Sequence, residues 1–114
     1  MELKAIKTIL QCQVLTDGLD MNMTVDTVLA SDGMSEILAF AKSRELMITG
    51  LTNILSIRTA DIAGVAAVLY CRGKSPEKKS IAFAREKGIP VLVTKWLMFD
   101  ICGVLHAKGL KGAS

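Results

Sequence analysis

Three apolar segments of this 114-residue chain are each followed directly by polar or charged residues. Their hydroxyls, amides and cations are the groups of the chain that are best suited to chemistry. They stand in Thr49-Gly50-Leu51-Thr52-Asn53, in Arg72-Gly73-Lys74-Ser75 and in Thr94-Lys95. Glycine turns, helix starts with unpaired N–H groups and positive charge are the surroundings in which proteins bind phosphates and other anions. The pattern therefore predicts an anion site made of Thr49, Thr52, Asn53, Arg72, Lys74, Thr94 and Lys95.

The same residues have a purely structural interpretation, which the sequence supports about equally. Threonine, serine and asparagine cap helices, glycine makes turns, and lysines on loops are usually solvated. What favours a site is the rule that ligands of open parallel sheets bind outside the carboxyl ends of the strands. The three loops must therefore meet at one edge of a sheet if they bind anything.

The sequence lacks a pattern for catalysis or for a metal. His106 stands four residues after Cys102, but two ligands do not make a metal site and no acid or cysteine pattern completes one. The nucleophile motif Gly-x-Ser-x-Gly, the dinucleotide-binding glycine motif and the phosphate-loop motif do not occur, and no paired carboxylates stand out. We therefore predict a chain that is not an enzyme and needs no cofactor.

The elements that must position the three loops follow from hydrophobic periodicity. Leu46–Thr49, Val65–Cys71 and Ile89–Val93 are short apolar runs, typical of strands whose two faces are both covered. Between them we expect helices, one from a cap at Thr52 to Gly64 and one from Ser75-Pro76-Glu77 to Gly88. Two more helices are expected, one capped by Ser31 or Asp32 before Met34 and one over Trp96–Ala107.

The first part of the chain has a different pattern. Leu3–Leu10 predicts a short helix, and Gln11–Thr16 a strand that ends at the turn signal Asp17-Gly18. Met21–Leu29 alternates in part and predicts an extended segment, so a hairpin is the simplest description. With the alternating strands and helices that follow, the predicted fold class is α/β, a three-layer α/β/α domain with a mixed, largely parallel sheet. Length allows one domain, residues 1–114.

Composition excludes several classes of function. The net charge of +3 is small, and residues 58–114 carry ten basic and four acidic side chains, so positive charge is local to the second half. With only five aromatic residues, the chain lacks the interleaved rings with which single-strand nucleic-acid binders stack bases. No apolar stretch is long enough to span a membrane and the start resembles no signal peptide. Three widely spaced cysteines fit reduced thiols, so we expect a cytoplasmic protein with no nucleic acid and no membrane as partner.

Laid out in this way, the chain resembles the DRTGG domain family along nearly its whole length. The resemblance depends on the order and spacing of several stretches, among them Ile48–Asn53, Arg72–Pro76 and Ala84–Leu92, together with Leu19-Asp20, Thr24-Val25, Ala30-Ser31-Asp32, Met34-Ser35, Thr94 and Cys102-Gly103. The chain departs from the family at its namesake element, where Met21 replaces the arginine and Asp26 stands near the usual glycine. Gly33 also replaces a bulky apolar residue. The resemblance thus gives no support to a role that needs that arginine.

The resemblance implies a fold similar to the N-terminal domain of bacterial HPr kinase/phosphorylase. It implies no catalytic activity, a regulatory or ligand-sensing role, and self-association as a homodimer. Our first hypothesis is a non-catalytic regulatory module that binds a small anionic ligand, a nucleotide or a phosphorylated metabolite. The alternative is an interaction or dimerisation module without a ligand, which contacts a partner protein through the hairpin and its methionines. A small-molecule enzyme is a distant third, because no acid–base pair or activated nucleophile is visible.

Overall fold

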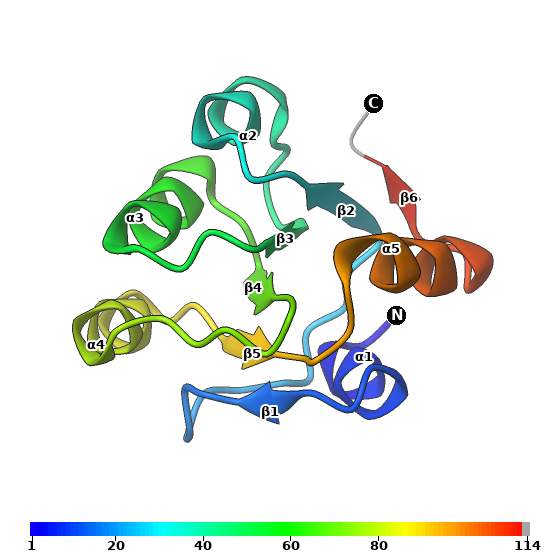
Figure 1. Cartoon of the computed structure of the whole chain (residues 1–114), viewed down its shortest axis with the longest axis horizontal. Helices are drawn as coiled ribbons and strands as arrows, with labels where there is room; N and C mark the ends of the chain where they lie inside the picture. The colour runs from blue at the N-terminus through cyan, green and yellow to red at the C-terminus, as the bar shows by residue number, and fades with distance from the viewer. Residues whose placement is uncertain (113–114) are drawn as a thin grey trace.

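A computed structural model describes residues 1–112 of the chain. It contains six short strands: β1 (Gln13–Val14), β2 (Thr27–Ala30), β3 (Leu46–Thr49), β4 (Ala67–Tyr70), β5 (Val91–Val93) and β6 (Lys111–Gly112). They form one sheet in the order β1-β5-β4-β3-β2-β6 (Figure 1). β1 is antiparallel to β5, and every other neighbouring pair is parallel. The predicted mixed, largely parallel sheet is confirmed.

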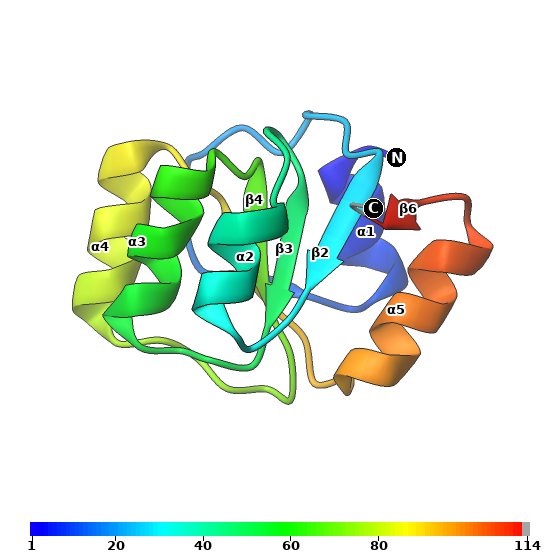
Figure 2. The same ribbon diagram turned by 90° about the horizontal axis from the view of Figure 1, so that it is seen from above.

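Five helices cover the two faces of this sheet: α1 (Leu3–Ile9), α2 (Met34–Phe40), α3 (Ile54–Ala63), α4 (Lys78–Lys87) and α5 (Met98–Ala107). α2, α3 and α4 lie on one face, and α1 and α5 lie on the other (Figures 1 and 2). The predicted three-layer α/β/α class is therefore confirmed. Within residues 1–112, no helix is long and apolar enough to cross a membrane.

The core is divided by the sheet into two layers, and the central strands contribute alternate residues to each. On β3, Leu46 and Ile48 pack with α1 and α5, whereas Met47 packs with α2 and α3. On β4, Leu69 belongs to the first layer and Tyr70 to the second, and all residues of both strands are buried. Because a shift of one residue would reverse every side chain, this burial holds the strand ends in register.

The helix ends confirm the glycine signals, but the predicted starts of α3 and α4 are wrong. Gly64 and Gly88 end α3 and α4 with φ angles of 70° and 71°, in the left-handed region where a side chain would be strained. α3 is capped by Asn53, whose side chain accepts a hydrogen bond from the Ser56 N–H, and not by Thr52. α4 begins only at Lys78, so the buried Pro76 precedes the helix and does not occupy its first turn.

The predicted hairpin is wrong. β1 pairs with β5 at one end of the sheet, whereas β2 lies between β3 and β6, four strands away. The segment between them bonds to the start of the chain, with the Leu3 N–H donating to the Met23 carbonyl at 2.9 Å. Met21 and Met23 are partly buried against the α1 layer of the core. Their alternation therefore comes from packing on α1, and the turn at Asp17-Gly18 does not return the chain to β1. The C-terminal strand β6 was not predicted.

Candidate functional site

The three predicted loops meet at one edge of the sheet. β2, β3, β4 and β5 are parallel, and Thr49 is in register with Tyr70, which is in register with Val93. Their carboxyl ends lie at the front of the molecule in Figure 1 and at the bottom of Figure 2. We call the residues that follow these strands (31–33, 50–53, 71–77 and 94–97) the carboxyl edge. The convergence that the parallel-sheet rule requires is thus present.

Hydrogen bonds of Gly50 connect the loop after β3 to the loops after β2 and β4. Its N–H donates a hydrogen bond of 2.7 Å to Oδ1 of Asp32, which also accepts a 3.0 Å bond from the Thr49 hydroxyl. Its carbonyl accepts a 3.2 Å bond from Nη2 of Arg72. A Cβ at Gly50 would lie 2.9 Å from that nitrogen and 3.3 Å from Cζ of the guanidinium. Only a glycine therefore leaves room for Arg72 to lie across the β3 loop.

Asp32 is the residue at this edge that sequence reasoning missed. The pattern indicated a helix cap, but α2 has Gly33 at its N-cap position and no side-chain cap bond. The Asp32 carboxylate instead binds the end of β3. The available signal was its position directly after β2, which puts it at the same edge as the other loops.

The backbone at Arg72 is strained. Its φ is 64° and that of Gly73 is 68°, so two consecutive residues are left-handed. For a residue other than glycine this costs roughly 1–2 kcal/mol. The two N–H groups donate to the carbonyls of Trp96 and Thr94 at 2.9 Å and 2.8 Å, which ties the β4 loop to the β5 loop. The strain is offset by these bonds, and it directs the exposed side chain back over β3.

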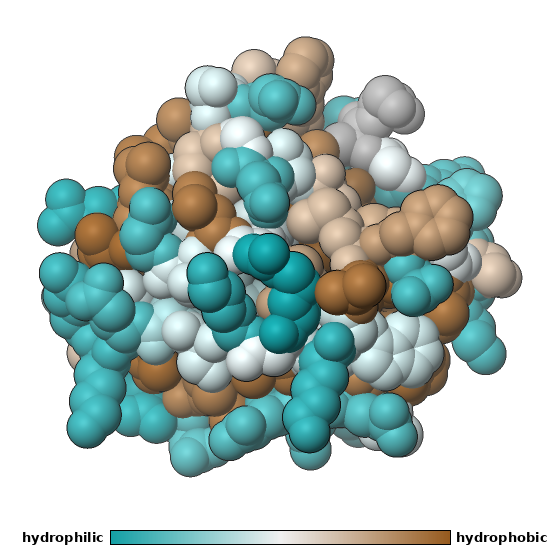
Figure 3. Space-filling view, viewed as in Figure 1, coloured by the Kyte–Doolittle hydropathy of each residue, from teal (hydrophilic) through white to brown (hydrophobic). Residues whose placement is uncertain are grey.

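The carboxyl edge carries excess positive charge. Arg72, Lys74 and Lys95 are exposed. In the part of the chain that the structure describes, every ion pair within 4.0 Å involves other cations: Met1, Lys4, Lys79 and Lys87. The acids of this edge are Asp32, whose carboxylate already accepts two hydrogen bonds, and Glu77, which pairs with Lys79. Polar residues gather over the middle of this face in Figure 3, with apolar residues beside them toward α5.

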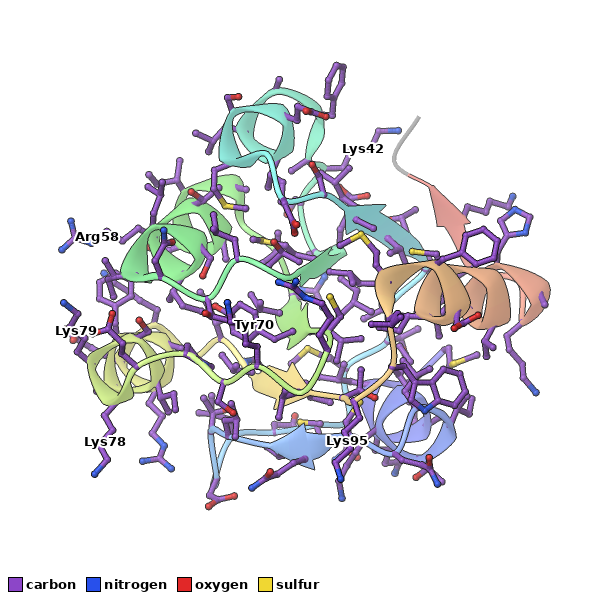
Figure 4. All side chains as sticks on the ribbon, in the orientation of Figure 1. Lys42, Arg58, Tyr70, Lys78, Lys79 and Lys95 are labelled. Atoms are coloured by element: carbon purple, nitrogen blue, oxygen red, sulfur yellow. The ribbon has the colours of Figure 1, made fainter. Side chains whose placement is uncertain are left out.

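The start of α3 is anchored to β4 by buried hydroxyls. The Ser56 hydroxyl donates a 2.7 Å bond to the Asn53 carbonyl and lies 2.6 Å from the Tyr70 hydroxyl, which is left to donate to it. Tyr70 is fully buried, and this burial raises the pKa of its phenol to about 12. The N-terminus of α3, with Thr52 and Asn53, is thereby held at the carboxyl edge (Figure 4).

Two of the predicted site residues are in the right place but have their hydroxyls in use. Thr49 donates to Asp32, and Thr94 donates a 2.6 Å bond to the Leu10 carbonyl. Both residues are almost completely buried. Their role in the structure is to position the loops. Of the seven predicted residues, Thr52, Asn53, Arg72, Lys74 and Lys95 are therefore the ones left to contact a ligand.

The five remaining residues do not form one cluster. Lys95 points away from the centre of the edge, past β5 toward β1 (Figure 4). Its Cγ would lie 3.6 Å from a Cβ at Gly73, so its stem follows the β4 loop. On this side a hollow of about 380 Å³ lies beside Trp96, with Gln11, Gln13 and Ser75 in its wall. Lys78 and Lys79 of α4 point outward and do not contribute (Figure 4).

The weaker constellation of Cys102 and His106 lies elsewhere. Both residues line a largely apolar groove of about 420 Å³ between α5, β2 and β6, and none of the seven predicted site residues lines it. Among residues 1–112, no group of three or more His, Cys, Asp and Glu side chains could hold a metal ion. Burial raises the pKa of the Cys102 thiol, which disfavours its thiolate form.

Comparison with known proteins shows a likeness in fold alone. No protein-family model matches the chain, and no curated protein matches it. A solved structure that it resembles is that of the CBS and DRTGG domains of the regulatory region of Clostridium perfringens pyrophosphatase, complexed with the activator diadenosine tetraphosphate. The TM-score is 0.71 and the identity 17%, over 91% of this chain. The likeness is one of fold. The match covers 45% of that chain, less than half of its length.

Proposed function

We propose that this chain is a non-catalytic regulatory module that senses a small anionic ligand at the carboxyl edge. The observation that carries the proposal is the Arg72 guanidinium, held over Gly50 by a strained backbone and exposed without a carboxylate partner within 4.0 Å in residues 1–112. A guanidinium presents several N–H donors in a plane, which suits the oxygens of a phosphate. The N-terminus of α3 adds unpaired N–H groups and a favourable dipole on the same edge.

Two further facts support a regulatory role over a catalytic one. The chain has the fold of part of a regulatory region, and that pyrophosphatase region was solved with a nucleotide activator. The order of motifs along the chain resembles DRTGG domains, and we assign it to that type of domain. We also propose that the protein is located in the cytoplasm, because Cys12 and Cys71 are buried free thiols and Cys102 is half-buried and free.

Thermal unfolding in the presence of ATP or pyrophosphate tests the proposal. A ligand at a hundred times its Kd adds about 2.7 kcal/mol to the free energy of unfolding, which for a domain of this size raises Tm by on the order of 10 °C. Arg72→Ala should lose most of this shift. Arg58→Ala is the matched control, because Arg58 is exposed on α3 and points away from the edge (Figure 4). No shift with either anion, or equal shifts in wild type and Arg72→Ala, would overturn the proposal.

A second candidate is a module for self-association or for binding another protein. The contact surface predicted for it, a hairpin with methionines, does not exist, and Met34 and Met47 are buried. What favours it is a different surface at the start of α5, where Leu97 is 57% and Phe99 87% exposed. We propose a homodimer through this surface. Light scattering should give a dimer for wild type and a monomer for Phe99→Ser, and a monomer for wild type at high concentration would exclude it.

A further inference from the structure

The carboxyl edge continues into a hollow whose wall contains Thr94 and Lys95 together with residues that were not predicted as a site. This hollow, which we call the Gln11 hollow, has a volume of about 380 Å³ and lies between the end of β5 and the β1 side of the sheet. Gln11, Gln13 and Ser75 supply polar groups to its wall, and Trp96 supplies a ring. Its size is near the lower limit for small-molecule pockets, so it suits one part of a larger ligand.

The wall of the hollow is held in an unfavourable backbone conformation. In residues 1–112, three residues other than glycine have a positive φ, and two of them, Gln11 at 53° and Arg72 at 64°, flank this region. Gln11 lies in the wall itself, and Arg72 precedes Gly73, which lies in the opposite wall. Glutamine has no intrinsic preference for left-handed backbone. Its position is imposed by the chain between α1 and β1, which turns the residue toward the hollow.

The groups in the wall match one kind of ligand. A carboxamide has both a donor and an acceptor, and this pair is complementary to the N6 amino group and N7 of adenine. Gln11 and Gln13 both carry one. The half-buried Trp96 ring offers a flat apolar surface on which a base can stack. Lys95, which also lines the hollow, keeps a positive charge at its mouth.

The distance between the hollow and Arg72 is that of a nucleotide. Gly50, under the guanidinium, follows β3, and Thr94, in the wall of the hollow, follows β5. β4 lies between them, so the two positions are two strand spacings, about 10 Å, apart. This is comparable with the separation between the base and the distal phosphate of a nucleoside polyphosphate.

We infer that the Gln11 hollow receives the adenine base of a nucleoside polyphosphate whose phosphates lie at Arg72. The inference rests on the proposed function and makes it more specific, because it distinguishes a nucleotide from other phosphorylated compounds. Gln11 and Gln13 bind the edge of the base, Trp96 stacks on its face, and Lys95 places its positive charge at the mouth of the hollow.

Titration of the whole chain with ATP and with inorganic tripolyphosphate tests the binding of the base separately from the binding of phosphates. Trp96 is the only tryptophan, so its emission reports on the hollow. We expect ATP to quench this emission and to bind at least tenfold more tightly than tripolyphosphate. The combined variant Gln11→Gly/Gln13→Thr should lose this tenfold preference and still bind tripolyphosphate. Glycine suits the φ of 53° at position 11 and threonine suits a strand, so the variant retains the fold.

Arg58→Ala is the control, because Arg58 is exposed on α3 and does not line this hollow. Equal affinities for ATP and tripolyphosphate would overturn the inference and leave the proposed function standing. A preference for ATP that the glutamine variant keeps, or that Arg58→Ala removes, would also overturn it. If neither compound binds, the inference and the proposed function both fail.

Discussion

Gly50→Ala is a small change that should weaken ligand binding with little loss of stability. The new methyl group would lie 2.9 Å from Nη2 of Arg72, closer than such atoms approach, and 3.3 Å from its Cζ and Nε, which is a tight contact. The obstruction is the end of a flexible side chain and the glycine has no positive φ, so the guanidinium moves and the backbone stays. The lost 3.2 Å bond to the Gly50 carbonyl is a partly exposed one. We expect a decrease in the free energy of unfolding of about 1 kcal/mol.

The effect on binding should be larger. A hydrogen bond between charged groups contributes about 1.5–3 kcal/mol, and about 1.4 kcal/mol corresponds to a factor of ten in Kd. Calorimetric titration with ATP should therefore show a Kd at least ten times higher for Gly50→Ala. Gly103→Ala is the matched control, since a Cβ there meets nothing within 4 Å and the site lies on α5.

Gly50→Ala should weaken binding only by displacing Arg72. In an Arg72→Ala background, the same glycine substitution should change the Kd for ATP by less than about twofold, as expected for two residues that act through one contact. A full tenfold loss in that background, or unchanged binding in the single variant, would refute it.

Three other predictions follow from the same contacts. Tyr70→Phe removes the hydroxyl that lies 2.6 Å from the Ser56 hydroxyl, and urea denaturation should show a loss of about 1 kcal/mol; no loss would contradict the anchoring of α3. Asp32→Asn keeps an acceptor for Thr49 and Gly50 but removes a negative charge, so ATP should bind a few-fold more tightly, and weaker binding would argue against an anion at this edge. Burial raises the pKa of the Cys12 thiol to about 12, and that of Tyr70 to about 12. Because both groups release protons more readily in the unfolded chain, stability should fall as the pH rises from about 9 to 12, and the double variant Cys12→Ala/Tyr70→Phe should show a flatter dependence of Tm on pH.

The parts of the fold that are set by local chemistry could be predicted from the sequence. Apolar runs identified β3, β4 and β5, and Gly64 and Gly88 marked the ends of two helices. The alternation of strands with helices required a parallel sheet. In a parallel sheet the loops after the three strands meet at one edge.

The predictions that were wrong concern residues whose hydrogen-bond or strand partners lie far away in the chain. A turn signal at Asp17-Gly18 cannot tell which strand β1 will join, and β1 joins β5, with Thr16 accepting a bond from Val91 75 residues away. Thr94 was expected to face a ligand, but its hydroxyl is taken by Leu10, 84 residues away. Asp32 was missed for the same reason, since its partners are on another strand.

The proposal that the carboxyl edge and the Gln11 hollow bind a nucleotide is best tested by locating bound ATP on the protein. Titration of ¹⁵N-labelled protein with ATP, followed by two-dimensional NMR, reports on each backbone N–H and on the indole of Trp96. We expect the largest shifts at Gly50, Gly73, Lys95 and the indole, with small shifts at His106 in the groove beside β6. Shifts concentrated around His106, or none at saturating ATP, would contradict it.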